Sequence, residues 1–160
     1  MKQRWLKLIC LLAVLAMAMP AAAKPANLLK NSSFESSEGL AQPKHWRMEC
    51  WIPGASASLT QSKVYDGKYA LVLESETEND CRMIQTVKVK GNKVYRFSGW
   101  VATEGVPEGQ YGANLCVMGG FVRSEGFNAT TDWRPLELVF RTYPGQKEVT
   151  LGARLGFFGS

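Results

Sequence analysis

The feature that most constrains the fold is the stretch VKVKGNKVYRFSGWV, which runs from Val87 to Val101. Apolar residues alternate with polar ones on both sides of Gly91-Asn92, and this period of two is typical of strands with one buried face. Glycine and asparagine tolerate the positive φ that a short hairpin connection needs. The pattern predicts a β-hairpin with Phe97 facing a core and Trp100 facing the opposite way. Because an isolated hairpin is not stable, it also predicts further strands on both sides and an apolar layer beneath.

The rest of the chain reads as short strands separated by turns. Tyr65-Asp66-Gly67-Lys68 is a turn signal and leads into the β run that ends at Leu73. No stretch after the N-terminal segment keeps a helical period, and there is no internal repeat or linker. Many short strands between turn signals are typical of an all-β antiparallel sandwich, so we expect one such domain.

The N-terminal segment has the order of a secretory signal peptide. Basic residues up to Lys7 precede an uncharged apolar run, Leu8 to Met19, and small residues follow as far as Ala23. The run is shorter than the roughly 20 apolar residues that a membrane span needs. We therefore expect residues 1–23 to be cleaved and residues 24–160 to be secreted or periplasmic, with no membrane span.

The charge of the remaining chain does not indicate a nucleic-acid partner. The sequence has 19 basic and 14 acidic residues, a net charge of +5, and three of the basic residues lie in the segment expected to be cleaved. The 16 that remain against 14 acidic residues give only +2, and they form no basic block. This composition gives no reason to expect nucleic acid as a partner.

Export would allow a disulfide among Cys50, Cys81 and Cys116. Cys116 lies inside a continuous strand pattern and would pack as a small hydrophobic residue, so Cys50–Cys81 is the favoured pair. Three buried thiols are the alternative. No cysteine or histidine spacing indicates a metal or redox site.

Several motifs occur in the order found in one family. The chain reads Asn31-Ser32-Ser33-Phe34-Glu35, then Pro43 to Trp46, Tyr65 to Leu71, Gln85 to Val101 and Thr131-Asp132-Trp133. In this order and spacing it resembles the carbohydrate-binding modules of the family 4/9/22 type, which are galactose-binding-like domains. The resemblance covers nearly all of the chain after the signal segment. It implies a jelly-roll β-sandwich that binds a polysaccharide or oligosaccharide.

The chain departs from the family in two places. Ser32 stands where the family usually has glycine, and the sequence stops at Gly159-Ser160, where the family continues into a last strand. We therefore expect the last strand to be missing from the sandwich, which would leave an unpaired edge.

The resemblance also implies a structural Ca²⁺ site. Its carboxylate ligands would be Glu35 and Asp66, with backbone oxygens near Ser33 and Tyr69, because Ca²⁺ takes several oxygen ligands. The family's remaining carboxylate would come from the missing strand. The alternative is that Glu35 and Asp66 only cap turns.

A sugar presents an apolar face and a rim of hydroxyls, so its site needs an exposed aromatic ring and planar polar groups. The candidate rings are Trp100, Trp51 and Tyr111, and the candidate polar groups are Arg82, Gln85 and Asn114. Burial in the core is the competing role for each ring. We assign to the core the remaining aromatic residues of the strands and motifs, namely Trp46, Tyr69, Tyr95, Phe97, Trp133 and Phe140.

No residues indicate catalysis. The acidic residues from Glu74 to Asp80 alternate with polar ones in what reads as a solvated loop, where nothing would raise the pKa of one carboxyl as glycoside hydrolysis needs. His45 is the only histidine and has no nucleophile motif near it. We therefore expect a secreted, non-catalytic carbohydrate-binding module, with a glycoside hydrolase as a possible partner. The alternatives are a structural or protein-interaction sandwich without a glycan, and the N-terminal fragment of a secreted glycoside hydrolase.

Overall fold

The structure is a computed structural model and describes residues 26–37, 39–40 and 42–157. The expected signal peptide and the Gly159-Ser160 end lie outside these residues. The described part contains eight strands and no helix, and accordingly no helix in it could cross a membrane. The strands are β1 (Arg47–Cys50), β2 (Ala55–Thr60), β3 (Ala70–Ser75), β4 (Cys81–Lys88), β5 (Val94–Val106), β6 (Ala113–Val117), β7 (Ala129–Arg141) and β8 (Glu148–Leu155).

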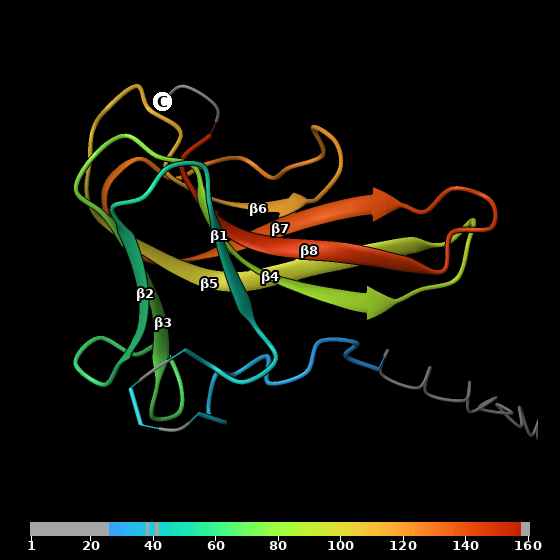
Figure 1. Cartoon of the computed structure of the whole chain (residues 1–160), viewed down its shortest axis with the longest axis horizontal. Coiled ribbons are helices and arrows are strands. Elements are labelled where there is room, and N and C mark those ends of the chain that lie inside the picture. The colour runs from blue at the N-terminus through green and yellow to red at the C-terminus, as the bar shows by residue number, and fades with distance from the viewer. Residues whose placement is uncertain (1–25, 38, 41, 158–160) are drawn as a thin grey trace, which may run out of the picture.

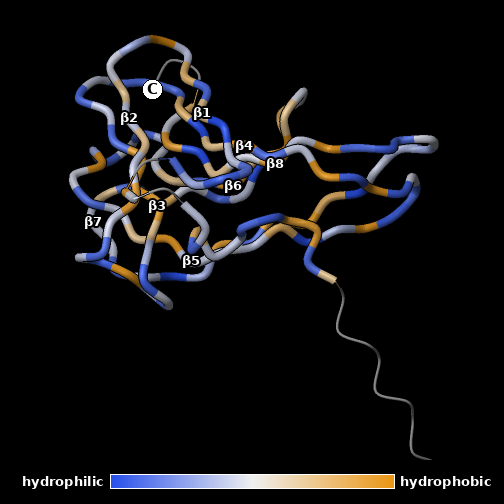
Figure 2. The backbone as a smooth tube through the Cα atoms, turned by 60° about the horizontal axis from the view of Figure 1, so that its bottom comes forward, coloured by the Kyte–Doolittle hydropathy of each residue, from blue (hydrophilic) through white to orange (hydrophobic). Residues whose placement is uncertain are grey.

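All strand pairs are antiparallel and form two packed layers with a small hairpin at one end (Figure 1). One layer is a four-stranded sheet in the order β1-β4-β8-β6, and the other is the pair β5-β7. The hairpin β2-β3 lies at the left of Figure 1. Figure 2 shows β4, β6 and β8 lying over β5, with apolar and polar residues alternating along the strands. The predicted all-β, antiparallel β-sandwich is confirmed.

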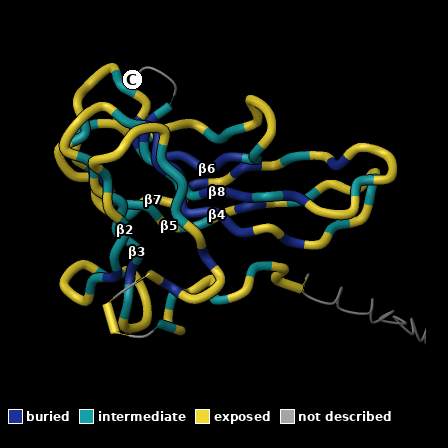
Figure 3. The backbone as a smooth tube through the Cα atoms, in the orientation of Figure 1, coloured by how far each residue is buried: buried dark blue, intermediate teal, exposed yellow. Residues whose placement is uncertain are grey.

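The core lies between the two layers. The four-stranded sheet contributes Val87, Leu115, Val149 and Leu151, and β5-β7 contributes Phe97, Leu136 and Leu138. Buried residues accordingly alternate with exposed ones along β5 and β7, and are denser on β4, β6 and β8 (Figure 3). Of the aromatic residues assigned to the core, Trp46 and Phe97 are buried, and Tyr69, Tyr95, Trp133 and Phe140 are half-buried.

The predicted hairpin over Val87–Val101 is wrong. β4 pairs with β1 and β8 and β5 pairs with β7, so the turn at Gly91-Asn92 connects two different layers. The turn bonds to the β7–β8 connection instead of closing a ladder: Thr142 Oγ1 donates to the carbonyl of Lys90 (2.7 Å) and accepts from the amide of Lys93 (3.0 Å). The alternation itself is right, because Phe97 is buried and Trp100 is exposed.

Candidate functional site

The predicted site residues separate onto the two outer faces of the sandwich. Arg82 on β4 is in register with Arg154 on β8, which is in register with Asn114 on β6. The neighbouring row, Met83, Ala153 and Leu115, faces the core, so the first row lies on the outward face of the four-stranded sheet. Trp100 lies on the outward face of β5-β7.

We call the first surface the arginine face. It consists of Trp51, Arg82, Tyr111, Arg123 and Phe157, with Asn114 and Arg154 buried beneath them. Sequence reasoning missed three of these residues: Arg123, Arg154 and Phe157. The one available signal is that Arg154 alternates with core positions along β8, but this pattern does not show which strands lie beside it.

Asp80 is the anionic centre of the arginine face. It accepts a hydrogen bond from Arg154 Nε (2.7 Å) and another from Arg154 Nη2, and Arg82 Nη1 lies 3.3 Å from both of its oxygens. Asp80 is 2% exposed and Arg154 is 6% exposed. The prediction that Asp80 belongs to a solvated loop is wrong, because two cations compensate its burial. Glu49 Oε2 lies 3.7 Å from Arg82 Nε, and Arg47 pairs with the other oxygen of Glu49, so the connected network holds three arginines against two carboxylates.

Rings and guanidinium groups stack at the rim of this face. The guanidinium carbon of Arg123 lies 4.8 Å from the ring centre of Tyr111 and 4.3 Å from that of Phe157. Arg154 lies 4.4 Å from the ring of Phe157, and the two rings are 5.2 Å apart. Tyr111 is 45% exposed, and Trp51, which follows β1, is 67% exposed. Such contacts fix the orientation of both the rings and the cations.

Asn114 supports the rim from beneath. It is buried, and its Nδ2 donates to the carbonyls of Gly112 (3.0 Å) and Gly156 (3.1 Å), which adjoin Tyr111 and Phe157. Its Oδ1 is buried and has no hydrogen-bond partner among the described residues. Asn114 therefore holds the two chain segments that carry the rings, and its own side chain is not at the surface.

The structure does not bring Gln85 to the arginine face. Gln85 lies in the core-facing row of β4, opposite Leu151, and is 7% exposed. Its amide group bonds to both backbone groups of Lys30, accepting from the amide (2.7 Å) and donating to the carbonyl (2.9 Å). Gln85 thus fixes the N-terminal segment to the sheet.

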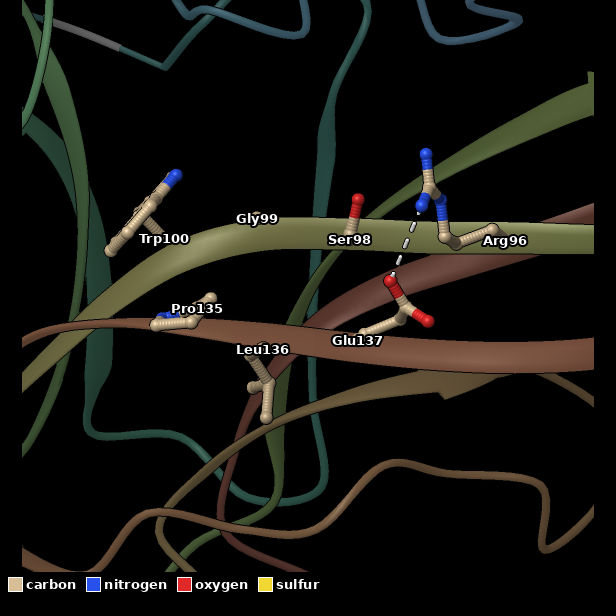
Figure 4. A pocket seen from close by; sticks show the side chains of 7 residues that line it. All are labelled: Arg96, Ser98, Gly99, Trp100, Pro135, Leu136 and Glu137. Carbon is tan, nitrogen blue, oxygen red and sulfur yellow. Dashed lines mark ion pairs between the residues drawn. The ribbon is translucent and has the colours of Figure 1, made fainter. Parts of the chain in front are cut away.

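We call the second surface the tryptophan face. It consists of Tyr65, Arg96, Ser98, Trp100, Pro135 and Glu137. A hollow of about 330 Å³ on the outer side of β5-β7 is lined by the last five of these residues, with Gly99 and Leu136 (Figure 4). Trp100 is 47% exposed and stacks on Tyr65 with ring centres 4.1 Å apart.

The residues expected to bind Ca²⁺ form only part of a site. Glu35 reaches the turn at Gly67, where its Oε1 accepts from the backbone amides of Lys68 (2.9 Å) and Tyr69 (3.0 Å). This contact joins the Glu35 and Asp66 segments, as either a metal site or a turn cap requires. Among the described residues, no group of three or more His, Cys, Asp or Glu side chains could hold a metal ion.

The structure joins Cys50 and Cys81 by a disulfide between paired positions of β1 and β4. Cys116 is a buried free thiol beside Gly152, where an added Cβ would lie 2.9 Å from its Sγ. Burial raises the pKa of the Cys116 thiol, and the nearby positive charges of Arg154 and Arg82 oppose that shift.

Comparison with known protein families assigns the chain to one of them. A family model described as a carbohydrate binding domain matches residues 26–156. Exochitinase 1 of Streptomyces olivaceoviridis is 29% identical over 145 residues, which are 91% of this chain and 21% of that protein. The chain therefore spans about a fifth of the length of this relative. The xylan-binding CBM22-1 domain of Paenibacillus barcinonensis Xyn10C is 20% identical, with 78% of this chain and 80% of that chain covered and a TM-score of 0.46.

Proposed function

The chain belongs to the carbohydrate-binding domain family, and on that premise we propose that its arginine face is the surface that binds a glycan chain. Membership makes it a binding module and not a catalytic domain. The observation that carries the choice of surface is the stacked array of Tyr111, Arg123 and Phe157, held in place by the buried Asp80–Arg154 pair.

The array suits a sugar for two reasons. An aromatic ring covers the C–H face of a pyranose, and a guanidinium group donates two parallel hydrogen bonds to neighbouring hydroxyls. The groups are also held before the ligand arrives, so binding loses little side-chain entropy. Trp51, at the end of β1, would provide a further ring for a longer chain.

The test is affinity electrophoresis in gels that contain soluble xylan, β-glucan, mannan, pectin or a soluble chitin derivative. The exochitinase is the reason to include chitin. We expect one polysaccharide to retard the protein and Trp51→Ala to weaken the binding about tenfold. Covering roughly 60 Å² of the exposed ring contributes about 1.5 kcal/mol, and about 1.4 kcal/mol is a factor of ten.

Tyr143→Ala is the matched control. Tyr143 is 66% exposed, close to the value for Trp51, but it lies between β7 and β8, at the opposite end of β8 from Arg154. The Tyr143→Ala variant should therefore bind the polysaccharide as the wild type does. A cooperatively melting protein that no polysaccharide retards would contradict the proposal and favour a structural or protein-interaction domain.

Three further expectations belong to this proposal. The module would be exported by the segment 1–23, and it would act beside a glycoside hydrolase, so that individually weak sites gain from attachment.

A structural Ca²⁺ ion would be held by Glu35, Asp66 and backbone oxygens near Ser33 and Tyr69, and it would fix the N-terminal segment. A thermal melt with Ca²⁺ or a chelator tests this: a higher melting temperature with Ca²⁺ that Asp66→Asn abolishes supports the ion, and identical melts leave Glu35 as a turn cap.

A further inference from the structure

We propose that the tryptophan face is a second glycan-binding surface, independent of the arginine face. The inference rests on the proposed function, because it assumes that the chain binds glycans. It comes from the strand alternation, which puts Trp51 on the same side as Glu49 and Arg82 of the four-stranded sheet and puts Trp100 on the outer side of β5-β7.

The Trp100 ring is held in a fixed orientation. It stacks on Tyr65 with an angle of 15° between the rings, and Tyr65 also contacts Trp133 with ring centres 5.9 Å apart. Trp100 nevertheless remains 47% exposed. A ring that is packed on one side and open on the other is the kind of platform on which a sugar can stack without loss of rotamer freedom.

Polar groups follow the ring along the strands. Register pairs Trp100 with Pro135, Ser98 with Glu137 and Arg96 with Val139. Figure 4 shows the side chains of Trp100, Ser98 and Arg96 in a row on β5, with Glu137 opposite on β7. The row extends over two steps of two residues, about 14 Å, which is long enough to contact more than one sugar ring.

The Arg96–Glu137 pair is suited to hydroxyl groups. The two charged groups are 3.7 Å apart, and their side chains are 69% and 51% exposed. An exposed ion pair of this kind is held weakly, so it can exchange its contact for hydrogen bonds to vicinal hydroxyls. The carbohydrate binding domain family to which the chain belongs makes a glycan the occupant to test on this face.

Two faces on one module change how it meets a polymer. The core and both sheets separate Trp51 from Trp100, so each surface could hold a different chain, or a different part of one chain. Each added contact would then raise the overall affinity through effective concentration.

The experiment is affinity electrophoresis of four proteins in the same gels: wild type, Trp51→Ala, Trp100→Ala and the double variant Trp51→Ala/Trp100→Ala. We expect each single variant to keep part of the retardation and the double variant to lose it. Isothermal titration with soluble xylan and with chitin hexasaccharide should give half the binding capacity for each single variant.

A second variant serves as a control for loss of folding. Trp100→Ala removes a ring that packs on Tyr65 and could therefore destabilise the fold. Arg96→Ala alters only an exposed side chain. In the Trp51→Ala background it should weaken glycan binding without lowering the melting temperature. If Trp51→Ala abolishes all retardation and Trp100→Ala binds as the wild type does, the second surface is refuted while the proposed function stands. If only Trp100→Ala matters, the arginine face is not a site and the claim of two surfaces fails. If the wild type is not retarded, the proposed function and this inference both fail for these glycans.

Discussion

Replacing Asp80 with asparagine should destabilise the domain strongly. The side chain keeps its size but loses its charge, so Arg154 and Arg82 lose the buried carboxylate that they share. Arg154 is 6% exposed, so water cannot replace the lost carboxylate. Removing one partner of a buried ion pair costs about 3–5 kcal/mol. For a domain of this size, this loss corresponds to a melting temperature lower by roughly 10–20 °C.

The assay is a set of thermal and urea melts of the wild type, Asp80→Asn and two comparison variants. Glu137→Gln removes a partner from the exposed Arg96–Glu137 pair and should cost less than about 1 kcal/mol. Asp80→Asn/Arg154→Met removes both buried charges and should recover much of the loss. The reasoning is refuted if Asp80→Asn melts within about 2 °C of the wild type, or if the double variant is no more stable than the single one.

Three further predictions concern other parts of the fold. Burial raises the pKa of the Cys116 thiol, so the folded state keeps the thiol proton to higher pH than the unfolded state does. The contribution of this thiol to the free energy of unfolding is therefore complete below the ordinary thiol pKa and is lost as the pH rises through the raised one. Urea melts between pH 8 and 10.5 should therefore show a steeper decline for the wild type than for Cys116→Ala, and parallel curves would contradict this. Reducing the Cys50–Cys81 disulfide, whose cysteines are 31 residues apart, should lower the free energy of unfolding by roughly 4 kcal/mol in melts with and without reductant, and an unchanged midpoint would contradict it. Gly112→Ala should lower the melting temperature and weaken glycan binding, because the added Cβ would overlap the carbonyl of Phe127 and displace the neighbouring Tyr111. Wild-type behaviour in both assays would show that this close contact is not required.

The sequence patterns predicted local structure well and strand pairing poorly. Alternation along Tyr95–Val101 correctly separated the buried Phe97 from the exposed Trp100, because a strand's two faces follow from its own residues. The same stretch suggested a hairpin, but pairing depends on residues far away: Thr142 binds the turn at Lys90–Lys93, some 50 positions earlier in the chain.

For the candidate site, too, local features could be predicted from the sequence and long-range contacts could not. Trp51 and Trp100 were correctly expected to be exposed, but nothing in their neighbours indicates that they lie on opposite faces. Asp80 reads as part of a polar loop because its partner, Arg154, is 74 positions away. Such long-range charge pairs leave no local pattern, so the centre of the arginine face could be found only from the structure.

The most direct test of carbohydrate binding at the arginine face is a titration of the ¹⁵N-labelled protein with xylohexaose and with chitin hexasaccharide, followed by two-dimensional NMR. Binding there predicts saturable shifts of the Trp51 indole N–H and of the backbone amides of Tyr111 and Arg123, with the amide of Tyr143 unchanged. Shifts that leave Trp51, Tyr111 and Arg123 unaffected, or no shifts with either sugar, would contradict the assignment.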